Sequence, residues 1–227
     1  MRRGLLALAL LALLPAAARA QSLADYDYTN LEFRGAGAAL GYIWPTKVAA
    51  TPVLSLRADL GYLGPGVRIV PSLSYWSSDF RRSELDRLAT RIDALPALRQ
   101  ANVTLTGADL GPVRWRDLAL DVDAQYVVTT PSGVLAYGGA GLGVHLLRGQ
   151  GAAIQGTFVQ DLLDSFAPAV TLLGGAEYRV GERLRVSGEL RLTAMGDVQY
   201  AGIRLGGMIM APGHRDTPAP PPAGGKP

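Results

Sequence analysis

Apolar and polar residues alternate almost without interruption over residues 182–194, ERLRVSGELRLTA. Leu184, Val186, Leu190 and Leu192 share one parity, and the other parity carries arginine, serine, glutamate and threonine. A period of two predicts a β-strand with one apolar face and one charged face. Such a strand fits a soluble sheet whose charged face meets water. It also fits an outer-membrane barrel whose apolar face meets lipid and whose charges point into the lumen.

Seven further segments have the character of long strands. The eight predicted strands cover residues 31–44, 51–63, 66–78, 114–128, 132–147, 168–180, 182–194 and 197–210. An average strand has about 5 or 6 residues, whereas a tilted strand that crosses a bilayer needs about 9 to 11. The lengths therefore favour strands that span a membrane.

The connections between these strands alternate between short and long. Tight turns are predicted near residues 63–65, 130–133 and 180–181, whereas the segments 79–113 and 148–167 are long. Outer-membrane barrels have short turns at the periplasmic end and long loops at the extracellular end. The last connection, at residues 195–196, is short and departs from this rule.

The longest connection contains a predicted helix in SELDRLATRIDALPALRQ, residues 83–100. Ser83 with Asp86 resembles a capping box at its start, and Pro96 is expected to stop or kink it. Its apolar residues at helical spacing are Leu85, Leu88, Ile92 and Leu95. We expect this face to lie across the barrel mouth, with docking of a partner as the alternative. A second short helix is predicted over residues 158–166.

The two ends of the chain differ in composition from the rest. MRRGLLALALLALLPAAARA has the layout of a cleaved secretory signal over residues 1–20. Residues 21–30 are then an N-terminal lead-in, and the proline- and glycine-rich residues 211–227 are expected to form a flexible tail. Removing the signal lowers the basic residues from 22 to 19, equal to the 19 acidic ones, and nucleic-acid binding is not expected. The absence of cysteine excludes disulfides and thiolate metal sites.

Eight alternating strands, a leader, unequal loops and a proline-rich tail together resemble the small outer-membrane barrels of the OmpA/OmpX/OmpW type. The resemblance covers residues 31–210 and implies an all-β fold, an eight-stranded antiparallel up-and-down transmembrane β-barrel with a short helix in an extracellular loop. It implies location in the bacterial outer membrane, with lipid, lipopolysaccharide and the outer-membrane assembly machinery as partners. The external partner is unknown. Many relatives end their last strand on an aromatic residue, whereas this strand ends at Met210.

A barrel of eight strands has a lumen that side chains can fill. We place nine charged residues in it: Arg57, Asp59, Asp121, Asp123, Glu177, Arg185, Glu189, Arg191 and Arg204. Paired charges tolerate burial, so a structural plug is one interpretation and a narrow path for water or ions is the other.

Aromatic and apolar residues predict two further features. Ten aromatic residues near the strand ends are expected to anchor the barrel at the membrane interfaces: Tyr42, Trp44, Tyr62, Tyr75, Trp76, Trp115, Tyr126, Tyr137, Tyr178 and Tyr200. An OmpW-like passage for small hydrophobic compounds would be lined by Phe158, Leu162, Leu163 and Phe166.

Catalytic and cofactor-binding patterns are weak. His145 would serve as the general base of a lipid-modifying hydrolase only with Ser165 and either Asp161 or Asp164 in reach, and no spaced triad supports this. The glycine-rich segments 35–41 and 138–143 lack the helix and the acidic residue of a nucleotide loop. We predict that they let strands or side chains approach closely. The chain is therefore predicted not to be an enzyme and to hold no cofactor or metal.

Overall fold

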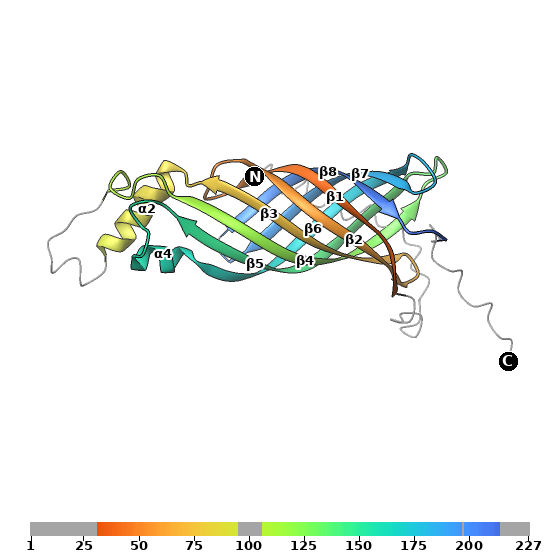
Figure 1. Ribbon diagram of the computed structural model, residues 1–227, viewed down its shortest axis with the longest axis horizontal. Helices are drawn as coiled ribbons and strands as arrows, with labels where there is room; N and C mark the ends of the chain where they lie inside the picture. Colours follow the sequence, from red (N-terminus) through yellow and green to blue (C-terminus); the bar gives the residue numbers. More distant parts are fainter. Residues whose placement is uncertain (1–30, 95–105, 197, 214–227) are drawn as a thin grey trace, which may run out of the picture.

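The computed structural model describes residues 31–94, 106–196 and 198–213. The expected signal, the lead-in, Leu95, Pro96 and most of the tail lie outside these residues. Eight antiparallel strands form one closed barrel in sequence order, with β1 paired to β8 (Figure 1). The strands are β1 (Leu31–Pro45), β2 (Thr51–Gly64), β3 (Val67–Asp79), β4 (Arg114–Thr129), β5 (Leu135–Gln150), β6 (Ser165–Arg179), β7 (Leu184–Met195) and β8 (Val198–Met210). The predicted all-β, eight-stranded fold is confirmed.

The predicted strand boundaries differ most around β5 and β6. β5 begins at Leu135 rather than at residue 132, because Thr130 to Gly133 form a turn in which Gly133 has a φ of 80°. β6 begins at Ser165, three residues earlier than predicted. The short turns between β2 and β3, β4 and β5, and β6 and β7 lie together at one end of the barrel (Figure 1). The long connections with the helices lie at the other end, together with the short β7–β8 connection. By the usual asymmetry of such barrels, the end with the helices is extracellular.

The outer surface of the barrel is apolar on all eight strands. On β7, Leu190 is 64% exposed and Leu192 is 59% exposed, whereas Arg185 and Glu189 are buried inside. Each of the other seven strands also carries large exposed apolar side chains, among them Leu40, Leu54, Tyr75, Leu120, Leu142, Leu172 and Leu205. A water-soluble protein rarely exposes a continuous apolar surface of this kind. Lipid is therefore the solvent of the outer face.

Helix α2 (Arg82–Asp93) lies in the connection between β3 and β4 and begins one residue before the predicted start. The predicted capping box at Ser83 is wrong, because the N-cap is Arg81 and no side chain caps the helix. The Arg81 guanidinium instead donates hydrogen bonds to the carbonyl oxygens of Val48 and Pro45, at 3.0 Å each. These bonds fix the start of the helix against the connection between β1 and β2.

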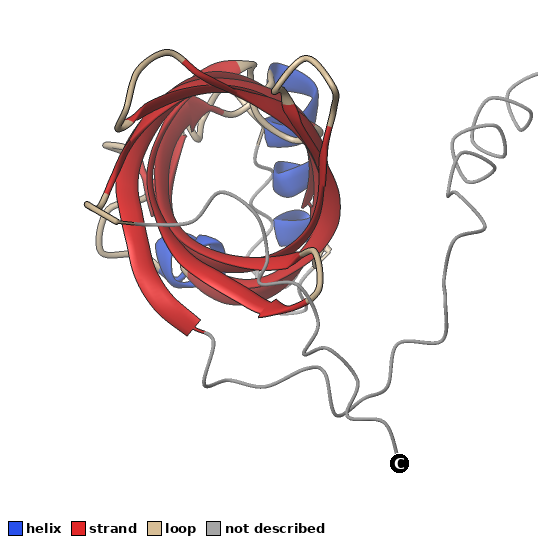
Figure 2. Ribbon diagram, turned by 90° about the vertical axis from the view of Figure 1, so that its right-hand side faces the viewer, coloured by secondary structure: helices blue, strands red, loops and turns tan. Residues whose placement is uncertain are grey.

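Helix α4 (Phe158–Leu163) is shorter than predicted, since Asp164 is already extended and β6 follows at once. In the view along the barrel axis, both helices overlap the opening that the strands enclose (Figure 2). Within the described part of the chain, neither helix is long and apolar enough to cross a membrane.

Only half of the predicted aromatic anchors face lipid. Tyr42, Trp44, Tyr75, Tyr126 and Tyr178 are exposed on the outer surface. The prediction is wrong for the other five, which are buried: Tyr62, Trp76, Trp115, Tyr137 and Tyr200. Four of them have the inward parity of their strands, and Tyr62 is turned inward by a register shift between Arg57 and Tyr62. Their nearness to strand ends does not determine their direction, because side chains alternate between the two faces.

Candidate functional site

All nine charged residues assigned to the lumen from the sequence are buried there, and none is more than 6% exposed. The structure adds Arg34, Arg68 and Asp117, which are also buried. Among the described residues, the buried charges are therefore six arginines and six carboxylates. Arginine suits such a site, because its planar guanidinium bonds carboxylates through two N–H groups.

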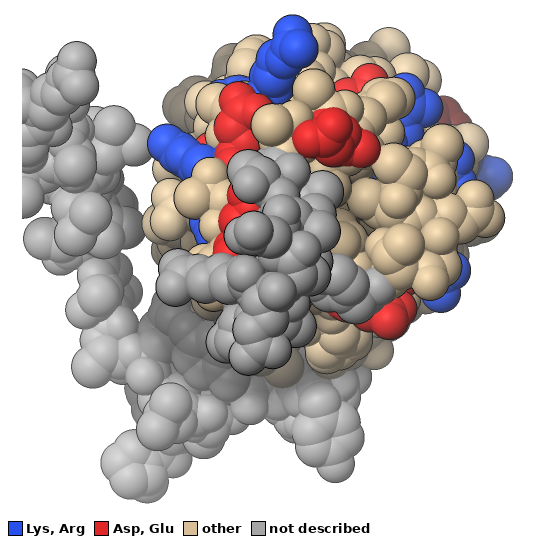
Figure 3. Space-filling model, turned by 90° about the vertical axis from the view of Figure 1, so that its left-hand side faces the viewer, with Lys and Arg blue, Asp and Glu red and all other residues tan. Residues whose placement is uncertain are grey.

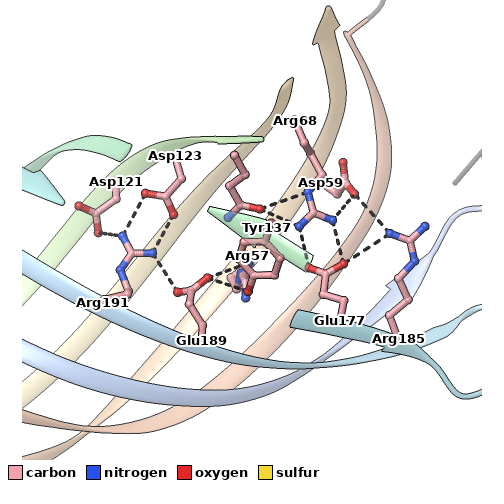
Figure 4. A network of polar contacts seen from close by, with 11 residues as sticks. Arg57, Asp59, Arg68, Asp121, Asp123, Tyr137, Glu177, Arg185, Glu189 and Arg191 are labelled. Atoms are coloured by element: carbon pink, nitrogen blue, oxygen red, sulfur yellow. Dashed lines mark hydrogen bonds and ion pairs between the residues drawn. The ribbon is translucent and has the colours of Figure 1, made fainter. Parts of the chain in front are cut away.

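The first group of paired charges surrounds Arg68, toward the periplasmic end (Figure 4). Its guanidinium donates two hydrogen bonds of 2.8 Å to the Glu177 carboxylate and others to the Gln125 side-chain oxygen. Asp59 lies 3.6 Å from Arg68 Nη1, and Arg185 Nη1 lies 3.6 Å from Glu177. Five strands, β2, β3, β4, β6 and β7, thus meet in one network across the lumen.

The second group surrounds Arg191 and Glu189 on β7 (Figure 4). Arg191 donates hydrogen bonds of 2.7 and 3.0 Å to the two oxygens of Asp123, and a longer one of 3.2 Å to Glu189. Glu189 also accepts a 3.0 Å hydrogen bond from the Tyr137 hydroxyl and lies 3.3 Å from Arg57. These contacts join β2, β4, β5 and β7.

One of the nine residues, Arg204, does not join either group. Its Nε and Nη1 atoms are buried and make no hydrogen bond within the described part of the chain. Arg204 is directly paired in register with Glu189 on β7, but the Glu189 carboxylate is used by Arg191, Arg57 and Tyr137. A side chain that points into the lumen therefore does not necessarily form a hydrogen bond with the charged groups beside it.

Arg68, the best-bonded arginine, was missed in the sequence. It lies near the start of β3, between Val67 and Ile69, on a face that continues with Val70, Ser72 and Ser74. A face that mixes apolar and small polar residues shows no clear charged row. The alternation around Arg68 was the one signal that could have identified it.

Two glycines on β5 make room for acidic side chains on β4. Gly141 is paired with Asp123, and Gly143 with Asp121. A Cβ atom on either glycine would overlap the Oδ1 atom of the aspartate opposite it. The glycine-rich segment 138–143 thus serves the close approach of side chains, as the sequence predicted.

The residues considered for a hydrolase do not form a catalytic triad. His145 is fully buried in the lumen, and its Nδ1 lies 2.7 Å from Asp117 Oδ2. Ser165 is exposed, and Asp164 accepts a hydrogen bond from the backbone N–H of Gly149. In residues 31–94, 106–196 and 198–213, no group of three or more histidine and carboxylate side chains could hold a metal ion.

Apolar side chains cover the charged layer at the extracellular end and lie beside it toward the periplasmic end. At the extracellular end, the apolar face of α2 packs into the barrel mouth, as predicted, and joins an outer apolar cluster. This cluster consists of Ile43, Val48, Val53, Trp76, Leu85, Leu88, Ala89, Ile92, Leu110, Val113, Trp115, Leu147, Ile154, Val159, Leu163, Ala169, Met195, Val198 and Tyr200. At the periplasmic end, an inner apolar cluster consists of Tyr62, Val127, Leu135, Tyr137 and Leu173.

A cavity of about 550 Å³ lies between α2, the start of β6 and the end of β7. Leu163 and Phe166 from the predicted apolar site line it, together with Leu88, Trp115 and Leu147. Leu163 is buried, whereas Phe166 on β6 is 65% exposed. The side chains of Phe158 and Leu162 lie outside what the structure describes. The cavity has the size of a small-molecule site, for which about 300–1,000 Å³ is typical.

The closed barrel, its lipid-facing outer surface and its charged lumen define an integral outer-membrane β-barrel protein. Among solved structures, the chain is similar to Neisserial surface protein A, with a TM-score of 0.51 and 13% identity over 78% of this chain and 97% of that one. It is less similar to Ail of Yersinia pestis (TM-score 0.46, 12% identity, 79% and 97% covered). The N-terminal β-barrel domain of Pseudomonas aeruginosa OprF is also less similar (TM-score 0.43, 14% identity, 77% and 97% covered). No protein-family model and no curated protein matches the sequence.

Proposed function

We propose that the protein has a structural or surface-interaction role in the outer membrane, without enzymatic activity, and that its lumen does not conduct ions. The observation that supports this proposal is the charge-balanced layer of six arginines and six carboxylates among the described residues, covered at the extracellular end by the outer apolar cluster. An ion passing through the lumen would have to displace these paired groups and cross the outer apolar cluster. In this role, lipid and lipopolysaccharide contact the outer surface, the assembly machinery inserts the barrel, and the extracellular connections face external partners.

Planar bilayers that contain the refolded protein are expected to show no conductance above that of the lipid. Insertion is established separately by heat-modifiable migration in detergent gels and by protection of the strands from protease. Stable conductance steps from a heat-modifiable preparation would contradict the proposal and favour an open path for ions.

A second candidate function is the binding or passage of small hydrophobic compounds at the extracellular end. The cavity favours it, because the outer apolar cluster supplies six of its fifteen lining residues and two of the residues predicted for such a site lie in its wall. Apolar ligands bind in concave sites of this kind by removing their surface from water.

The substitution Ala167→Trp tests this candidate by filling the cavity, since Ala167 lines it and packs against the outer apolar cluster. We expect binding of an apolar fluorescent dye to weaken by about tenfold or more, equivalent to about 1.4 kcal/mol. Ala201→Trp is the matched control, because Ala201 faces outward on β8. Equal dye binding and uptake by both variants would count against the cavity.

A further inference from the structure

We propose that the extracellular cavity binds an anionic single-chain amphiphile, with its acyl chain among apolar side chains and its headgroup at a basic rim. This inference rests on the second candidate function and adds the chemical class of the ligand. It is argued below from the lining of the cavity, the charges at its entrance and its position next to the lipid-facing surface.

The deep part of the cavity is apolar. Four buried members of the outer apolar cluster line it: Leu88 of α2, Trp115 of β4, Leu147 of β5 and Leu163 of α4. The Trp115 indole N–H donates a 2.9 Å hydrogen bond to the Leu163 carbonyl, so the one polar atom of this indole is already satisfied. A hydrocarbon chain is the kind of group that such a lining favours.

The rim carries an excess of positive charge. Lys47 and Arg91 line the cavity together with Glu84, and the same three residues line an adjoining depression of about 430 Å³ to which Arg87 also contributes. The Glu84 carboxylate is bonded by Arg87 one helical turn along. Among the described residues of the rim, three basic side chains thus stand beside one carboxylate, which Arg87 bonds. Figure 3 shows this end of the molecule, where charged groups border an otherwise uncharged surface.

The cavity also borders the lipid-facing surface. β6 pairs with β7 only from Ala169, opposite Met195, so residues 165–168 pair with β5 alone. These four residues and Gly196 line the cavity, and Phe166 among them is directed outward. A ligand that partitions into the membrane fits this position better than a fully water-soluble anion does.

The test is binding of brominated dodecanoate to the protein in nanodiscs, measured by quenching of Trp115 fluorescence in a variant that also carries Trp76→Phe, since Trp76 lies in the outer apolar cluster. Trp44→Phe serves as the background, because Trp44 faces lipid and would report bromine in the bilayer. We expect saturable quenching that weakens as salt is raised. Each methylene removed from the chain is expected to raise Kd about fourfold. The uncharged brominated alcohol of equal length should bind more weakly than the carboxylate.

Charge reversal at the rim separates headgroup recognition from simple apolar binding. Arg91→Glu is expected to raise Kd for the carboxylate about three- to tenfold, with no effect on the alcohol. Arg82→Glu is the matched control, since Arg82 lies on the same helix but does not line the cavity. Every variant is first checked for heat-modifiable migration.

The outcomes distinguish the two proposals. Equal binding of carboxylate and alcohol, or equal effects of the two charge reversals, would overturn the headgroup inference and leave an apolar site. Absence of saturable quenching by either ligand would overturn the second candidate function with it.

Discussion

The substitution Arg68→Leu is expected to lower the free energy of unfolding by about 3–5 kcal/mol, because it leaves buried carboxylates without their main partner. Arg68 is fully buried and supplies the two shortest hydrogen bonds to Glu177 as well as those to Gln125. Arg185 would remain near Glu177, but at 3.6 Å. Urea titration of the protein folded in lipid vesicles measures the effect.

Two further variants test whether the loss of stability comes from leaving buried charges unpaired. Arg114→Leu removes an arginine that is ion-paired with Asp79 at the surface, where both side chains are more than half exposed, and should change stability little. The double variant Arg68→Leu with Glu177→Leu removes both charges and should be more stable than Arg68→Leu alone. A double variant that is less stable than the single one would contradict the proposed origin of the effect.

The substitution Leu190→Arg is expected to lower the free energy of unfolding in lipid by about 2–4 kcal/mol, since it places a charge on the lipid face near the middle of β7. Leu190 is 64% exposed and points away from the lumen. In a water-soluble barrel, the same change would put a charge into water and cost little. The same vesicle titration therefore tests which solvent surrounds the barrel.

Leu184→Arg is the matched control on the same strand. Leu184 is the first residue of β7 and also faces outward, but it lies near the membrane interface, where the expected cost falls to about 0–1 kcal/mol. Equal effects at the two positions would contradict a lipid environment that varies with depth along β7.

The face of each strand could be predicted from the sequence because the two faces of a strand alternate with a fixed period. The outward direction of Leu190 and the inward direction of Arg185 and Glu189 both follow from that period. Closeness to a strand end does not determine whether a side chain faces lipid or the lumen, as Trp76 and Trp115 show. Their inward parity, and not their distance from the interface, puts them into the outer apolar cluster.

The partners of the buried groups could not be predicted, since they depend on how the strands are staggered around the barrel. Arg68 and Glu177 are 109 residues apart and meet across the lumen. His145 is paired in register with Ala119 but bonds Asp117, two residues earlier on β4. The sequence pattern predicts which residues share the interior, whereas the register determines which of them touch.

The bonds across the lumen also act on the wall of the barrel. If β6 slid by one residue against its neighbours, Glu177 would turn from the lumen to the hydrocarbon of the bilayer, and Arg68 would lose both of its carboxylate bonds at once. The ion pairs thus connect strands on opposite sides of the barrel. They disfavour a register shift that the hydrogen bonds between neighbouring strands alone would allow. The paired charged side chains that fill the barrel therefore make its cross-section rigid and favour a single register in which the barrel can close.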